Sequence, residues 1–140
     1  MGSRVKTWEV GIAAFANDVI GEAFVWGSTD CAALTFRALA IMRPDVDSTI
    51  DWDSLRTARD RLALEQPHQW FERIGGRGVT PLSFASTGDV ILGELRELRL
   101  PAFHLIVGNH ALTSSPAEGV FSVPVARLLA RDDVDLWRLP

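Results

Sequence analysis

The sequence predicts an α+β domain in which N-terminal helices pack on a small antiparallel sheet. Three observations lead to this fold class. Apolar residues recur at three- and four-residue spacing in the first half, short alternating runs follow in the second half, and 140 residues is the length of one ordinary domain, 1–140. Helices that precede strands, instead of alternating with them, are typical of α+β proteins and not of βαβ units.

Helical periodicity runs through the first half of the chain. Helices are expected over residues 7–20, 31–42, 53–64 and 68–74. The second helix has the sharpest limits, because Thr29 or Asp30 can cap its start and Pro44 stops it. Its apolar, alanine-rich composition predicts a helix that is buried on nearly all sides.

The second half changes to the two-residue period of strands. Short strands are expected over residues 89–92, 102–107, 111–114, 119–122 and 134–137, with a helical turn at 125–130. Gly108-Asn109 predicts a tight turn between two of these strands. Residues 75–87 carry Gly, Pro, Ser and Thr and are interpreted as a connector.

Composition and charge exclude several classes of protein. The chain carries 14 basic and 18 acidic residues, a net charge of −4, with no basic stripe, so we expect no nucleic-acid partner. No apolar run approaches about 18 residues, so we expect no membrane span. The N-terminus lacks the apolar centre of a secretion signal, so we expect synthesis in the cytoplasm. A single cysteine excludes an internal disulfide and a multi-cysteine zinc site.

The one cysteine, Cys31, stands at the start of the second predicted helix. Unpaired backbone N–H groups in a first helical turn favour a thiolate, which is the nucleophile of cysteine hydrolases. The alternative is that Cys31 fills the core as a small apolar residue. Asp30 also has two interpretations: most simply it caps the helix, and otherwise it tunes the pKa of Cys31.

Three histidines could supply a base for this thiol. His104 lies inside an apolar strand, where a rigid backbone could hold the imidazole within hydrogen-bond reach of Cys31. His68 and His110 are expected to be solvated. His104 is therefore the candidate base, and a buried structural histidine is the alternative.

The order of these elements resembles the NlpC-type cell-wall peptidases, which are compact papain-like cysteine hydrolases. It is most similar to short members found among phage tail and gene-transfer-particle proteins. In that family an aromatic-x-Trp-Gly stretch precedes Asp-Cys-Ser-Gly-Leu, then Gly-Asp precedes a core strand, and the next strand starts with the catalytic histidine. The corresponding segments here are Phe24-Val-Trp26-Gly27, Asp30-Cys31-Ala32-Ala33-Leu34, Gly88-Asp89 and the strand that contains His104.

The sequence departs from the family pattern at several positions. Ala32-Ala33 replaces Ser-Gly, and Phe24 stands where the family usually has tyrosine. The spacing from His104 to the Gly108-Asn109 turn is two residues shorter than usual, so Ala102 takes the place of the histidine if the turn is the anchor. Because a shift of two keeps a residue on the same strand face, His104 is still expected to reach Cys31, from a displaced position.

The resemblance implies a cysteine peptidase that cleaves peptide bonds in peptidoglycan and needs no metal or other cofactor. Cys31 would attack the amide carbonyl, its backbone N–H would stabilise the oxyanion, and His104 would take up and return the proton. The third residue, which orients the imidazole, is expected on the following strand: Thr113 first, with Ser114, Ser115 or His110 as alternatives.

The resemblance further implies that Phe24, Trp26 and Asp30 line the substrate site, and Trp52 and Trp70 could line a groove. Two other functions stay open: a catalytically inactive structural adaptor of the phage tail tip, and an amidase or acyltransferase that uses the same dyad. Expected partners are a peptidoglycan peptide and other tail-tip proteins, with the chain incorporated in a phage tail or gene-transfer particle. The arginine-rich residues 56–61 are interpreted as a solvated helix face or a docking surface.

Overall fold

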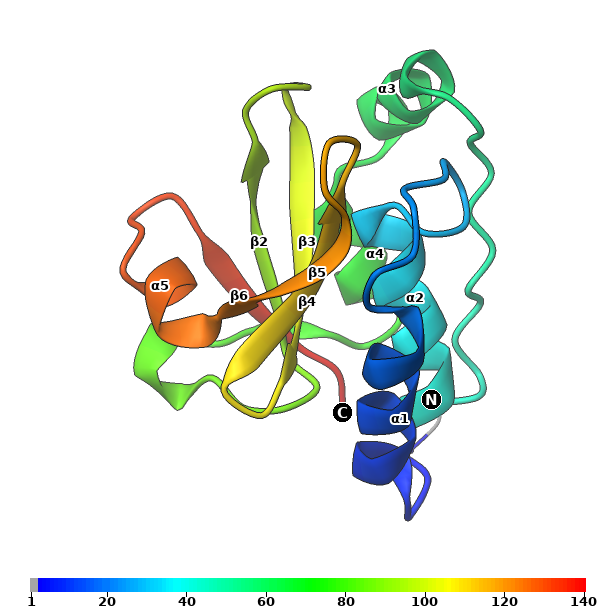
Figure 1. Cartoon of the computed structure of the whole chain (residues 1–140). Helices are drawn as coiled ribbons and strands as arrows, with labels where there is room; N and C mark the ends of the chain where they lie inside the picture. Colours follow the sequence, from blue (N-terminus) through cyan, green and yellow to red (C-terminus); the bar gives the residue numbers. More distant parts are fainter. Residues whose placement is uncertain (1–2) are drawn as a thin grey trace.

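Helices and an antiparallel sheet meet along one apolar interface in the computed structural model, which describes residues 3–140 (Figure 1). The helices on this side are α1 (Trp8–Val19), α2 (Cys31–Met42), α3 (Leu55–Leu64) and α4 (Pro67–Arg73). Within the described residues the sheet has six strands: β1 (Arg77–Gly78), β2 (Val90–Leu95), β3 (Leu100–Val107), β4 (His110–Ser115), β5 (Gly119–Pro124) and β6 (Asp135–Arg138). Their order is β1-β6-β2-β3-β4-β5, and the predicted α+β class is confirmed.

The segment between α4 and β2 differs from the predicted connector. It contains β1, which pairs antiparallel with β6 through Gly78↔Trp137, and the short 3-10 helix η1 (Leu82–Phe84). A strand of two residues shows no alternation in a sequence, so periodicity could not find it. The other helices and strands lie where the periodicity placed them, within a few residues.

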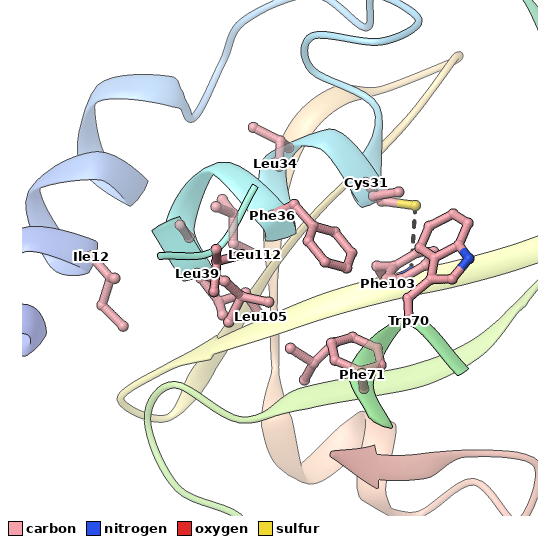
Figure 2. Close-up of a cluster of buried hydrophobic side chains, with 14 of the residues drawn as sticks. Ile12, Cys31, Leu34, Phe36, Leu39, Trp70, Phe71, Phe103, Leu105 and Leu112 are labelled. Atoms are coloured by element: carbon pink, nitrogen blue, oxygen red, sulfur yellow. Dashed lines mark hydrogen bonds between the residues drawn. The ribbon is translucent and has the colours of Figure 1, made fainter. Parts of the chain in front are cut away.

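The central helix α2 packs on β3 and β4 and carries most of the interface. Nine of its twelve residues are buried, which confirms the expectation of a helix enclosed on nearly all sides. Figure 2 shows Phe36 and Leu39 of α2 facing Phe103 and Leu105 of β3.

Phe103 is the centre of an aromatic cluster in this interface. Its ring lies 6.3 Å from Phe36, 6.1 Å from Trp70 and 6.3 Å from Phe71, measured between ring centroids. These separations are within the range of favourable aromatic pairs. The cluster therefore joins α2, α4 and β3.

A second apolar cluster covers the opposite face of the sheet. It is built from Val79, Ile91, Ile106, Ala111, Leu128, Val134 and Leu136. Leu128 belongs to α5 (Val125–Leu129), the helical turn that follows β5. As a result β3 is buried on both faces, with six of its eight residues out of contact with water.

The Gly88-Asp89 pair has a structural role at the start of β2. The Asp89 carboxylate is fully buried, accepts from the Ser86 N–H at 3.0 Å, and accepts two bonds at 2.8 Å from the Arg138 guanidinium. A paired, hydrogen-bonded geometry of this kind is what makes a buried carboxylate tolerable. Asp89 thereby ties β2 to β6.

The segment that follows α1 pairs with the outer edge of β5 at Val120. The Gly21 N–H donates to the Val120 carbonyl, and the Val120 N–H donates to the Glu22 carbonyl, both at 2.9 Å. Gly119 makes this approach possible, since its φ is +70° and a Cβ would collide with the Glu22 carbonyl oxygen. A side chain at position 119 would push the segment off the strand.

We predict that Phe71→Ala destabilises the fold by about 3–5 kcal/mol, because it leaves a cavity at a fully buried position beside Phe36 and Phe103. Urea unfolding measures the change. Leu64→Ala is the control, because Leu64 is 83% exposed and should change the free energy of unfolding by less than about 0.5 kcal/mol. Equal effects of the two substitutions would contradict this account of the core.

Candidate functional site

Asp30 organises the start of α2 through three hydrogen bonds. Its carboxylate accepts from the Ala33 N–H at 2.9 Å, from the Gly27 N–H at 2.6 Å and from the Trp52 indole N–H at 2.9 Å. The side chain is buried. Asp30 is therefore the N-cap that was expected, and its oxygens are engaged by the protein itself.

The Trp-Gly pair before this helix has a steric reason. Gly27 has a φ of +79°, and a Cβ there would collide with the Trp52 carbonyl oxygen. Only glycine allows the backbone of residues 50–52 to approach this closely. The motif that carries the family resemblance thus shapes the loop that holds Asp30.

Cys31 sits in the first turn of α2 with its sulfur buried against β3. The Phe103 N–H donates to Sγ across 3.4 Å, as the dashed line in Figure 2 shows. Burial raises the pKa of the Cys31 thiol to about 12; the bond from the Phe103 N–H opposes this rise, and the nearby Asp30 carboxylate adds to it. At neutral pH this environment favours the thiol over the thiolate that a cysteine nucleophile requires.

The sulfur takes the place of a strand partner. The β3–β4 ladder runs through Val107↔His110, Ile106↔Ala111 and Leu105↔Leu112. Two residues further, Phe103 would be the next position to exchange backbone bonds with β4. Its N–H donates to Cys31 instead, and its carbonyl accepts from the Thr113 hydroxyl at 2.9 Å.

His104 lies on the face of β3 that points away from Cys31. It is directly opposite Ile91 in the β2–β3 register, and Ile91 belongs to the cluster under α5. Its Nδ1 lies 3.3 Å from the Ile91 carbonyl oxygen. Since successive strand residues point to opposite faces, Phe103 faces Cys31 and His104 does not. The structure therefore does not bring the predicted pair together, which corrects the pairing inferred from the sequence.

The surroundings of His104 favour a neutral ring. Burial lowers the pKa of His104 below its ordinary value of 6.5, the nearby Arg131 charge lowers it further, and the bond to Ile91 opposes the shift. His104 has the features of a buried structural histidine. Ala102, the other position considered for the family histidine, lies on the same face as His104 and has no side-chain proton to transfer.

The candidates for the third residue are engaged elsewhere. Thr113 donates to the Phe103 carbonyl, the Ser115 hydroxyl accepts from the Glu118 N–H at 3.2 Å, and His110 lies on the surface with Nδ1 2.8 Å from the Asn109 side-chain oxygen. Ser114 is buried, and its hydroxyl has no hydrogen-bond partner among residues 3–140. None of the hydrogen bonds within that part of the chain joins these side chains to His104.

Phe24 and Trp26 do line a pocket with Asp30 and Cys31, as expected. Their rings meet edge to face at 4.8 Å, and residues of α3 and of the turn between β2 and β3 form part of the remaining lining. The cavity has a volume of about 20 Å³. This is room for about one water molecule and not for a peptide.

A larger hollow of about 370 Å³ lies between residues 47–52, α3 and α4. Trp52 and Trp70 form part of its wall, as the sequence allowed. Both indoles are buried, and the Arg61 guanidinium covers the Trp70 ring at 5.1 Å from its centroid. The two tryptophans therefore act as packing, with no free aromatic face for a ligand.

Two residues have supporting roles here that no sequence pattern indicates. Phe103 and Trp52 hold Cys31 and Asp30 in place, yet neither belongs to a recognisable motif. Because both faces of β3 are apolar, alternation gave no signal for which residue faces α2. Asp30 was the one available signal for such a partner. A buried carboxylate that caps a helix needs further hydrogen-bond donors, and here the Trp52 indole is one of them.

Comparison with known families assigns the chain to one of them. Residues 3–131 match the model of the family described as a domain of unknown function (DUF6950), so the chain belongs to that family. No curated protein matches the chain. Across residues 3–140, no helix is long and apolar enough to cross a membrane, and no group of three or more His, Cys, Asp or Glu is placed to hold a metal ion.

We predict that iodoacetamide labels Cys31 at pH 8 at least about a hundredfold more slowly than it labels a free thiol such as glutathione, because the thiolate is scarce and the sulfur is buried. Mass spectrometry of timed samples measures the rate. A His104→Asn variant that stays folded should label at the wild-type rate, since the imidazole is on the other face of β3. Labelling as fast as glutathione, or a slower rate in His104→Asn, would contradict this geometry.

Burial of His104 predicts a loss of stability in mild acid. A folded-state pKa below the ordinary value means that the unfolded chain binds the proton first. The contribution of His104 is therefore complete above about pH 6.5 and is lost as the pH falls through the lower folded-state value. Urea unfolding between pH 8 and pH 5 should show a shallower slope for His104→Leu than for wild type. His110→Gln, at an exposed position, is the control, and a slope unchanged by His104→Leu would refute the assignment.

Proposed function

We propose that the chain is a non-catalytic, papain-like structural adaptor of a phage tail tip or gene-transfer particle. The observation that carries this proposal is the bond from the Phe103 N–H to the Cys31 sulfur. A buried, protonated thiol that completes a strand pairing has a structural role, and the proposed base faces the other side of the sheet.

The arrangement of elements supports the papain-like part of the proposal. A cysteine opens a central helix, an Asp caps that helix, and the helix packs on antiparallel strands that follow a Gly-Asp pair. These are the features on which the resemblance to NlpC-type peptidases rests. Two features that peptide hydrolysis requires differ from those of a peptidase. A base should lie within reach of the sulfur, and there should be room for a peptide beside it.

The peptidase is the competing function, and two requirements of its chemistry favour the adaptor over it. A general base must lie within about 3 Å of the thiol proton, or reach it through one water molecule. The substrate must also reach the sulfur, whereas the cavity beside Cys31 holds about 20 Å³. Hydrolysis would need α3 and the β2–β3 turn to move away and a base to be supplied from outside this site.

We predict that the purified protein releases no new amine groups from peptidoglycan sacculi above the level of a Cys31→Ala variant. Amines are counted after derivatisation with fluorodinitrobenzene, and a known peptidoglycan endopeptidase is the positive control. Circular dichroism confirms that the Cys31→Ala protein is folded. Release that occurs with wild type and disappears with Cys31→Ala would overturn the proposal in favour of the peptidase.

The adaptor role has its own test in particles released by cells that carry the gene. Mass spectrometry should find the chain in purified particles. A Cys31→Ser variant should be incorporated as well as wild type, because a hydroxyl can still accept from the Phe103 N–H. Absence of the chain from tailed particles would refute the virion setting, and failure of a folded Cys31→Ser protein to support infection would refute a purely structural thiol.

A further inference from the structure

A groove of about 300 Å³ runs between α3 and the β2–β3 hairpin, on the far side of the residues that close over Cys31. It is lined by Arg59, Leu62, Ala63, Gln66, Pro67, Arg99, Leu100 and Pro101. Its lining combines apolar side chains with the polar side chains of one glutamine and two arginines. Figure 1 shows α3 and the tip of the hairpin at the same end of the molecule.

The two arginines give the groove a positive charge that nothing in its walls balances. Arg59 reaches across from α3 and donates to the Leu98 carbonyl at 2.9 Å, so its guanidinium lies next to the residue that carries the second charge. Within residues 3–140 the Arg99 side chain has no hydrogen bond or ion pair. Asp60 and Glu97 are sequence neighbours of these arginines, but neither lines the groove.

The backbone of Arg99 is left-handed at the end of the turn between β2 and β3. Its φ is +54°, the one positive value at a non-glycine residue in the described part of the chain. A left-handed conformation costs a residue with a Cβ about 1–2 kcal/mol relative to its usual conformations, and glycine adopts it freely. An exposed arginine at such a position suggests that its side chain is needed where the turn places it.

We propose that this groove binds an acidic, partly aliphatic peptide segment of a partner protein. A carboxylate fits the guanidinium groups of Arg59 and Arg99, because arginine binds carboxylates through paired hydrogen bonds. Aliphatic side chains next to that carboxylate can contact Leu62, Leu100 and Pro101 of the lining. The proposal does not depend on the virion setting, since neither Cys31 nor Asp30 lines this groove, which shares only Leu62, Leu100 and Pro101 with the Cys31 pocket.

The rest of the molecule makes a polyanion a poorer occupant. The chain has a net charge of −4, and a phosphate backbone needs an extended positive surface to displace its counterions. Two arginines beside apolar lining residues match a single carboxylate with apolar neighbours. Inorganic phosphate therefore serves as a competitor that tests this choice.

The binding test compares two peptides that differ in one charge. The probes are N-acetyl-Leu-Glu-Leu-amide and N-acetyl-Leu-Gln-Leu-amide, titrated into the ¹⁵N-labelled full chain and followed by NMR. The Glu peptide should shift the amides of residues 62–63 and 99–100 and bind about tenfold or more tightly than the Gln peptide, as expected for a charge-assisted bond. Arg99→Gln should remove the difference between the peptides, whereas Arg127→Gln on α5 should keep it.

Arg99→Gly separates a binding role from a structural one. This substitution relieves the left-handed strain, so it should raise the melting temperature and at the same time abolish the preference for the Glu peptide. Equal affinity for the two peptides, no detectable binding, or an unchanged preference in Arg99→Gln or Arg99→Gly would overturn the proposal. Displacement of the Glu peptide by an equal concentration of inorganic phosphate would also overturn it, because the groove would then respond to charge without recognising a peptide.

Discussion

The backbone of Phe103 is the point on which the two halves of the molecule depend. Its side chain fills the aromatic cluster between α2 and α4, its N–H holds the sulfur at the start of α2, and its carbonyl holds a hydroxyl of β4. Strand, helix and neighbouring strand are therefore aligned by one residue. A buried N–H without a partner would cost about 1–3 kcal/mol, so Cys31 stabilises the fold as an acceptor.

Sequence patterns predicted the elements and the cap but not the face of one strand. Amphipathic spacing located α1 and α2, and the Asp-Cys pair located the start of α2, because these signals are local. Whether His104 faces Cys31 depends on a one-residue register choice in a strand buried on both sides. Apolar residues are acceptable on both faces of this strand. The residues next to His104 therefore give no pattern that indicates which face the imidazole occupies.

The residues that hold Asp30 and Cys31 in place also fill the space around them. Trp52 binds the cap oxygen that a looser loop would leave to solvent, and Phe103 occupies the space in front of the sulfur. Each contact stabilises the fold, and each removes something that chemistry would need. Packing and activity therefore make opposite demands on the space beside the sulfur.

The covering of β5 has a consequence for how this molecule can assemble. An open strand edge invites other chains to add a strand, which leads to swapped dimers or fibrils. Here Gly21 and Glu22 already occupy the backbone groups of Val120, β5 ends at Pro124, which lacks an N–H, and β1 at the other end of the sheet is two residues long. Backbone pairing is thereby restricted at both ends of the sheet, which favours association through side-chain surfaces that can be specific for one partner.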